Sequence, residues 1–250
     1  MPMAEFRFYA ELNDFLLRHR RGRTFARPVN DRQSVKHVIE ALGVPHTEIG
    51  MLLINGEPAG LDHVLSGGER VAVLPVLRRL APAYAKEPPR FAADAHLGRL
   101  ARYLRFSGFD TLWDNAWGDA ELVALAGTEE RIVLTRDRAL LMHKALRAGC
   151  YLRDKDALAQ LADVARRCAL DLGGGSLARC LECNAVLCPV AKPEVEEQLL
   201  PGTRAAFDEF WRCAACRRVF WRGSHWQRMR HAVASVMRTI RAADFPAVRP

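Results

Sequence analysis

The chain has 250 residues, of which 50% are hydrophobic and 26% are charged. This composition is typical of folded globular proteins and excludes disordered, collagen-like and fibrous chains. No apolar run approaches the roughly 18–20 residues that a membrane-spanning helix needs, and the first ten residues lack the apolar core of an export signal. The sequence therefore predicts a cytoplasmic protein of one to three domains that has no membrane partner.

The net charge and the number of cysteines indicate what kind of partner the protein has and what role its cysteines have. Lys and Arg number 37 against 29 Asp and Glu, which gives a formal net charge of +8, nearly all of it from arginine. Arginine binds phosphate through a planar, bidentate group, so the excess favours a polyanionic partner. Four of the 7 cysteines form two Cys-x-x-Cys pairs. An odd number of cysteines favours metal binding or free thiols over a disulfide scaffold.

The first block, residues 1–77, has the pattern of a small mixed domain. The expected elements are strands over 5–9 and 24–29, a helix from Ser34 to Gly43, and strands over 51–54 and 71–76. Ser34 is a typical helix N-cap, and the dipeptide Asn55-Gly56 is typical of a hairpin turn. This order resembles the β-grasp, ubiquitin-like sulfur carriers of molybdopterin and thiamine synthesis.

One departure separates this block from those carriers. They end in an exposed Gly-Gly whose carboxylate takes up sulfur, whereas here Gly67-Gly68 is internal and precedes the strand at Val71. The resemblance therefore implies the fold and not the carrier activity. Pro82, Pro88 and Pro89 then indicate a linker over 78–89, because proline removes a backbone donor and restricts the residue before it.

The second block, residues 90–172, alternates short strands with helices. Strands are expected over 91–93, 110–113, 132–134 and 150–152, with helices over 96–107, 119–126, 138–147 and 156–170. Such alternation predicts a parallel sheet covered by helices on both faces. Gly173-Gly174-Gly175 is expected to form a flexible joint after this block.

Acidic residues follow several of the predicted strands. Asp94 ends the first strand and Asp137 follows the third, while Asp119 begins a helix. Ligands collect at the carboxyl edge of a parallel sheet, and clustered carboxylates require a divalent cation to offset their repulsion. The alternative is that each aspartate is only a helix cap or a turn former.

Several separate motifs resemble the PIN-like ribonuclease domain first described in the carboxy-terminal region of the mut-seven exonuclease. They cover about residues 90–229 and include the segments Arg90–Asp94, Leu97–Arg105, Gly108–Thr111, Leu134–Arg138, Arg179–Asn184, Asp208–Cys213 and Val219–Trp226. The resemblance implies an α/β nuclease with a parallel sheet, for which a β-grasp domain ahead of it is a known companion. It also implies Mg²⁺ or Mn²⁺ held by a set of catalytic acids, expected to be Asp94, Asp119, Asp137 and Asp154. Asp154 is preferred over Asp156 as the fourth acid, and His96 is expected on the surface.

The third block, residues 176–230, contains the two cysteine pairs. Cys180, Cys183, Cys213 and Cys216 supply four thiolates for a closed, structural zinc site, and the insertion over 188–210 is expected to loop out. Cys188 and His225 are further candidate ligands, although neither has a paired spacing. The alternatives for the two pairs are a redox dithiol or plain core cysteines.

Basic and aromatic residues are interleaved after the insertion. From Phe210 to Ala243 there are eight arginines and no acid. Arginine and exposed aromatic rings together favour single-stranded nucleic acid, whereas the alternative is that the rings form a small ribbon core. A second arginine stripe, Arg99, Arg102 and Arg105, lies next to the first acid, with a solvated helix face as its alternative. The predicted RNA-binding residues are Arg99, Arg102, Arg136, Arg222, His225 and Trp226.

Together these observations predict a β-grasp domain, a PIN-like nuclease domain, a zinc ribbon and a basic C-terminal helix or tail over 231–250. The expected function is metal-dependent hydrolysis of RNA phosphodiester bonds, with a protein partner or RNA bound by the β-grasp domain. The alternative is an inactive PIN-like module that binds RNA or ribosomes. A sulfur carrier is disfavoured by the internal Gly67-Gly68.

Overall fold

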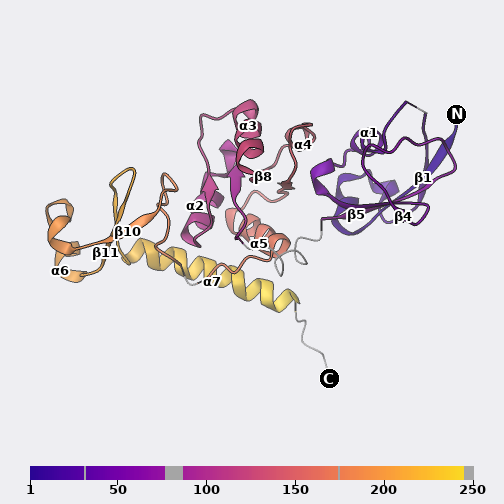
Figure 1. Ribbon diagram of the computed structural model, residues 1–250. Helices are drawn as coiled ribbons and strands as arrows, with labels where there is room; N and C mark the ends of the chain where they lie inside the picture. The colour runs from indigo at the N-terminus through magenta and orange to yellow at the C-terminus, as the bar shows by residue number, and fades with distance from the viewer. Residues whose placement is uncertain (31, 77–86, 174, 245–250) are drawn as a thin grey trace, which may run out of the picture. The chain divides into compact units, whose positions relative to one another are not determined.

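The computed structural model describes residues 1–30, 32–76, 87–173 and 175–244, and Figure 1 labels their main elements. Three parts of the expected organisation lie outside the described residues: 78–86 of the expected linker, Gly174 of the expected joint, and the last six residues of the expected tail. The chain forms two compact units, Met1–Ala81 with Asp119–Tyr151, and Pro82–Gly118 with Leu152–Pro250. Among the described residues, no helix is both long and apolar enough to cross a bilayer.

The N-terminal residues form a β-grasp sheet, as predicted, with five strands where the sequence predicted four. Its strands are β1 (Met3–Phe8), β2 (Phe25–Pro28), β3 (Ile49–Ile54), β4 (Glu57–Pro58) and β5 (Arg70–Pro75), in the order β2-β1-β5-β3-β4. The pair β1–β5 is parallel and the other pairs are antiparallel. Helix α1 (Val35–Ala41) is capped by Ser34, whose hydroxyl accepts the backbone N–H of His37 at 3.3 Å. Single 3-10 turns lie at Ala10–Phe15, Arg18–Arg20 and His46–Glu48.

Alternation along β1 explains which face of this sheet is buried. Ala4, Phe6 and Phe8 are buried, and the two phenylalanine rings stack near Phe25. Asn55 and Gly56 both have positive φ, which a two-residue hairpin turn of the mirror-image type requires. The turn leads into β4, a two-residue strand that the sequence did not predict.

The second part of the same unit contains α3 (Asp119–Glu129), β8 (Ile132–Thr135), α4 (Arg138–Leu141) and β9 (Gly149–Tyr151). Strands β8 and β9 are parallel, as expected, with Leu134 opposite Cys150. The helix predicted over 138–147 is wrong in length, because α4 ends at Leu141. The chain then turns, with the N–H of Leu146 donating to the carbonyl of His143, so that the buried Leu146 precedes β9.

The other unit begins with β6 (Phe91–Ala93), a 3-10 turn at Ala95–Leu97 and α2 (Gly98–Phe106). Strand β7 (Thr111–Leu112) runs parallel to β6, with Phe91 opposite Thr111. Leu100, Ala101 and Leu104 form the buried stripe of α2. Helix α5 (Ala157–Cys168) begins at Asp156, whose carboxylate accepts the N–H groups of the next turn.

The predicted arginine stripe on α2 is wrong for Arg105. This side chain is 2% exposed, and its guanidinium donates to the carbonyls of Thr111 (2.8 Å), Leu181 (3.0 Å) and Glu182 (2.8 Å). Burial lowers the pKa of Arg105, although an arginine remains charged at neutral pH. Arg105 therefore holds backbone carbonyls together and is not available to a phosphate backbone.

The cysteine-bearing segment forms a three-stranded antiparallel sheet that we call the ribbon domain. Its strands are β10 (Leu187–Val190), β11 (Phe210–Cys213) and β12 (Val219–Phe220). The insertion between β10 and β11 contains 3-10 turns at Lys192–Glu194 and Glu196–Gln198 and helix α6 (Pro201–Ala206). Val195, Leu199 and Phe210 give it a small core of its own.

Helix α7 (Ser224–Asp244) is one continuous helix, drawn in yellow in Figure 1. His225 and Trp226, two of the predicted RNA-binding residues, lie in the first turn of this helix. Met229, Val233 and Val236 are buried and are spaced by four and three residues, which places them on one face. Helix α7 packs against α2 and α5.

Candidate metal centre and nucleic-acid interface

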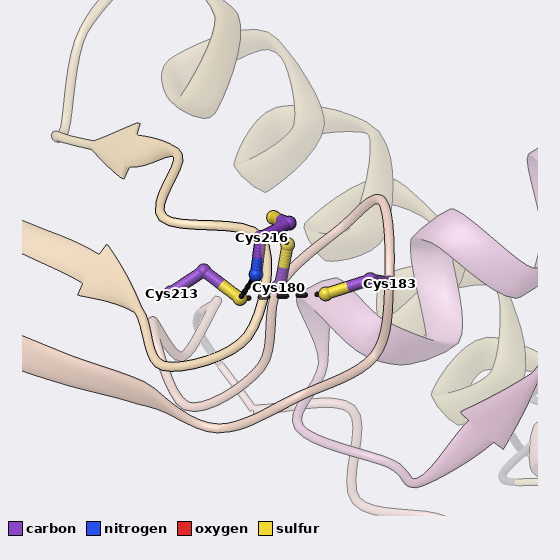
Figure 2. A group of neighbouring side chains, drawn as sticks. All are labelled: Cys180, Cys183, Cys213 and Cys216. Atoms are coloured by element: carbon purple, nitrogen blue, oxygen red, sulfur yellow. Dashed lines mark hydrogen bonds between the residues drawn. The ribbon is translucent and has the colours of Figure 1, made fainter.

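The two cysteine pairs come together in the ribbon domain (Figure 2). The ligand atoms of Cys180, Cys183, Cys213 and Cys216 all lie within 4.8 Å of one another. The sulfurs of Cys180 and Cys216 are 3.6 Å apart, and those of Cys183 and Cys213 are 3.3 Å apart. Four sulfurs that bind one zinc ion tetrahedrally lie about 3.8 Å apart, since each Zn–S bond is about 2.3 Å. The group therefore has the size of a four-thiolate metal site.

Two matching turns position these sulfurs. In the first turn, the N–H of Asn184 donates to the carbonyl of Cys180, and in the second the N–H of Arg217 donates to that of Cys213. Asn184 and Arg217 each follow the second cysteine of a pair, and both have positive φ. The same local fold is thus used twice. Cys188 is exposed on β10 and lies outside the four-sulfur group, as does His225.

The four thiols differ in how readily they ionise. Burial raises the pKa of Cys180, and desolvation also raises that of Cys216. Burial opposes ionisation of Cys213 too. However, the backbone N–H of Cys216, at 3.4 Å, donates to the Cys213 sulfur and, together with the Cys183 thiol, lowers the pKa of Cys213 to about 7. A metal ion binding here would displace protons from the other thiols, because thiolates are the ligands.

The first two predicted acids lie directly after parallel strands. Asp94 follows β6 and is half-buried, with its carbonyl accepting the N–H of Leu97 at 2.8 Å. Asp137 follows β8, is exposed, and accepts the N–H of Ala139 at 2.7 Å as the N-cap of α4. The capping alternative therefore applies to Asp137. A carboxylate has a second oxygen, so capping leaves Asp137 able to bind a cation.

The remaining predicted acids are both exposed. Asp119 is the first residue of α3, and Asp154 follows β9 and accepts the N–H of Asp156 at 3.0 Å. Asp156 caps α5 through the N–H groups of Leu158 and Ala159, both at 3.0 Å, which gives it a structural role. Asp94 and Asp154 belong to one unit and Asp119 and Asp137 to the other, so their shared site stays a prediction.

Two of the predicted RNA-binding residues, His225 and Trp226, line a cavity of about 220 Å³. Its wall also includes Phe106, Phe220, Trp221 and Arg179. The Arg222 guanidinium lies 5.1 Å from the ring centre of Trp211 and 5.8 Å from that of Trp226, and it pairs with Glu209 at 3.1 Å. The indole nitrogen of Trp226 is buried and has no hydrogen-bond partner among the described residues. Trp226 also packs on Phe106, with ring centres 6.1 Å apart.

The other predicted RNA-binding arginines are all on the surface. Arg99, Arg102 and Arg136 are exposed, and Arg102 pairs with Glu182 of the ribbon domain. His96 is also exposed, as expected.

Sequence reasoning missed the polar contacts that fix the ribbon domain to β7. The Asn184 side chain donates to Asp110 at 2.8 Å and accepts the N–H of Thr111 at 3.0 Å, while Arg179 pairs with Asp110 at 3.3 Å. Asn184 lies 73 residues after Thr111 and 74 residues after Asp110 in the sequence. The only available signal was that Asn184 and Asp110 both fall in the quoted family motifs.

Two protein-family models together match most of this chain. The model of the Mut7-C RNAse domain matches residues 89–233, and the model of the Mut7-C ubiquitin domain matches residues 1–81. A search of curated proteins finds no match.

Two crystal structures of small archaeal modifier protein 1 from Haloferax volcanii are similar to part of the chain. One is 22% identical, covers 30% of this chain and 98% of that chain, and has a TM-score of 0.25. The other is 23% identical, covers 29% and 93%, and has a TM-score of 0.24. The family models span more than half of the chain and contain the cysteine group and the acids after β6 and β8. The chain therefore belongs to the Mut7-C RNAse domain family and carries a Mut7-C ubiquitin domain ahead of it.

Proposed function

We propose that this protein is a metal-dependent ribonuclease that hydrolyses RNA phosphodiester bonds. The observation that carries the proposal is the match of residues 89–233 to an RNAse domain, which includes both aspartates that follow parallel strands. Asp94 and Asp137 would hold the catalytic ion, with Asp119 and Asp154 completing the set. The cytoplasm is the proposed location, because the ribbon domain needs reduced thiols.

The chemistry of the donor set fits a hard divalent cation. Carboxylate oxygens are the ligands that Mg²⁺ and Mn²⁺ prefer, and such an ion, when bound, polarises a phosphoryl oxygen and lowers the pKa of water. The protein's own contribution is orientation. The N–H of Ala139 fixes one oxygen of Asp137, and the N–H of Asp156 fixes one oxygen of Asp154. Each carboxylate keeps its remaining lone pairs for the cation.

We also propose that the four cysteines of the ribbon domain hold zinc. Four thiolates in tetrahedral contact leave no position for substrate, so this ion would be structural. The ribbon domain would present the 220 Å³ cavity to the RNA strand. A base would stack on Trp226 inside it. His225 in the cavity wall and Arg222 beside the Trp226 ring, with Arg99, Arg102 and Arg136, would attract the phosphates. The ubiquitin domain would contact a protein partner.

The decisive experiment is cleavage of labelled single-stranded RNA by the full chain in the presence of Mn²⁺. We expect Asp94→Asn and Asp137→Asn each to lower the rate by about 10²–10³-fold, the usual cost of removing one group that stabilises a transition state. Asp156→Asn is the matched control, because asparagine caps a helix as well as aspartate does and the rate should hold.

Each other outcome of that assay has a clear meaning. If Asp137→Asn cleaves at the wild-type rate, the capping bond to Ala139 is the whole role of Asp137 and the proposed site is wrong. If the wild-type chain binds RNA but leaves it intact with Mn²⁺, the protein is the RNA-binding module considered as the alternative. The backbone N–H groups that the carboxylates of Asp137 and Asp154 already accept are the observations that favour this second function.

The ribbon surface makes a separate prediction about RNA affinity. We expect Arg222→Ala to reduce the slope of log affinity against log salt concentration by about one unit, because one phosphate contact is lost. Fluorescence titration at several salt concentrations measures this slope. Arg147→Ala is the control, since that arginine is 87% exposed but lies far along the chain from the ribbon domain. Equal slopes for the two variants would place the RNA elsewhere.

A further inference from the structure

The most detailed contacts outside the proposed sites join the ubiquitin domain to the segment 138–151. Three consecutive residues of one 3-10 turn, His46, Thr47 and Glu48, each have a hydrogen bond to the backbone of that segment. The ring nitrogen Nε2 of His46 lies 2.9 Å from the carbonyl of Leu146, and the Thr47 hydroxyl donates to the carbonyl of Leu141 at 3.3 Å. We call these three residues the latch.

Glu48 makes the shortest of these bonds. Its carboxylate accepts the N–H of Tyr151 at 2.6 Å, and Glu48 is only 1% exposed. Tyr151 lies on β9, so the carboxylate satisfies a backbone group of that strand, which would otherwise be costly to bury. A buried acid in such a place is unusual unless it has partners. The latch therefore holds the backbone of β9 through the N–H of Tyr151.

The latch also explains where α4 ends. Leu141 is the last residue of α4, and its carbonyl is one of the groups that a helix C-terminus leaves unsatisfied. The Thr47 hydroxyl satisfies it, so the helix need not continue. The side chain of His46 is itself held by Glu40 at 2.7 Å.

Apolar and cationic contacts support the latch at both ends of the segment. The rings of Phe15 and Tyr151 have centres 5.3 Å apart, and the guanidinium of Arg138 lies 5.2 Å from each ring. A side chain at Gly149 would overlap Leu141 and reach 3.3 Å from the Thr47 hydroxyl, so the backbone approaches the latch closely there.

Arg138 directly follows Asp137, the acid that caps α4. Contacts that fix Arg138, Leu141, Leu146 and Tyr151 therefore fix the segment that begins at Asp137. We propose that His46, Thr47 and Glu48 are positioning residues of the nuclease, through which the ubiquitin domain sets the placement of the Asp137 carboxylate. This inference rests on the proposed function for the role of Asp137, but the latch itself does not depend on it.

Hydrogen exchange of the full chain, followed by mass spectrometry, tests the latch. We expect Thr47→Val and Glu48→Ala to raise exchange in peptides over 138–151 by about tenfold, because each leaves a buried backbone group without its partner. Glu48→Gln should restore protection, since its amide oxygen still accepts the N–H of Tyr151. Thr47→Val keeps the size of the side chain and answers the question even if Glu48→Ala fails to fold.

Glu69→Ala is the matched control. Glu69 accepts the N–H groups of Ser66 (2.7 Å) and Gly67 (2.8 Å) within the ubiquitin domain. Burial acts against the charge of Glu69, but these bonds outweigh it and lower its pKa. Its loss should loosen the loop at 66–69 and leave exchange over 138–151 unchanged. Unchanged exchange over 138–151 in Thr47→Val and Glu48→Ala would overturn the latch.

Kinetics then test positioning separately from stability. For cleavage with Mn²⁺, the latch variants should lower kcat about tenfold at unchanged KM for RNA, and Glu48→Gln should recover kcat. Faster exchange with an unchanged kcat would overturn the positioning role. If the wild-type chain cleaves no RNA, the proposed function fails while the exchange result still decides whether the latch exists.

Discussion

Replacing Cys180 with serine is expected to abolish metal binding and to unfold the ribbon domain. The four sulfurs already lie close enough to share one ion, and Cys180 is buried against Cys213 and Leu187. Structural zinc contributes about 10–16 kcal/mol to the folding of small zinc domains, so loss of one ligand removes most of what holds these short strands. Zinc content measured by mass spectrometry should fall from one ion per chain to nearly none.

Cys188→Ser is the matched control for that result. Cys188 lies on β10 of the same ribbon domain, is exposed, and stands outside the four-sulfur group. The variant should keep one zinc ion and the wild-type unfolding temperature. Loss of zinc in Cys188→Ser, or full retention in Cys180→Ser, would show that the ligand set is different from the one proposed.

Arg105→Met is expected to lower the free energy of unfolding by about 3–5 kcal/mol. The substitution keeps the apolar stem but leaves the carbonyls of Thr111, Leu181 and Glu182 without their shared donor. Each buried carbonyl without a partner costs about 1–3 kcal/mol. Removing one partner of a buried charged network costs about 3–5 kcal/mol in all, which is the total that we expect here. Urea unfolding followed by tryptophan fluorescence measures the change.

Arg102→Met provides the comparison on the same helix. Arg102 is half exposed and pairs with Glu182 at the surface, and exposed ion pairs contribute about 0–1 kcal/mol. The difference between the two variants should therefore exceed 2 kcal/mol on the same principle. Similar losses for both would mean that Arg105 stabilises the protein through packing of α2 alone.

Periodicity predicted most of the elements, because burial in this fold follows local pattern. The alternating residues of β1 and the leucine stripe of α2 are buried as expected. The spacing of the cysteines also identified the four residues that the structure brings together. Along β1, along α2 and within each Cys-x-x-Cys pair, the sequence signal and the structural cause lie within a few residues of each other.

The failures came from contacts between distant residues. Arg105 has the same spacing as Arg99 and Arg102, but two of the three carbonyls that bind its buried guanidinium lie 76 and 77 residues away. The pattern over 138–147 is helical, but α4 ends where Thr47, 94 residues away, satisfies the Leu141 carbonyl.

The latch also bears on how the chain folds as it is synthesised. Glu48 and Tyr151 are 103 residues apart, and at about 5–20 residues per second roughly 5–20 s separate their emergence from the ribosome. During that interval the turn at 46–48 lacks its partners in the segment 138–151, although His46 can already contact Glu40. Because His46, Thr47 and Glu48 are polar, water can form hydrogen bonds with them until β9 has been synthesised. An apolar turn here would instead expose an aggregation-prone hydrophobic surface on every nascent chain.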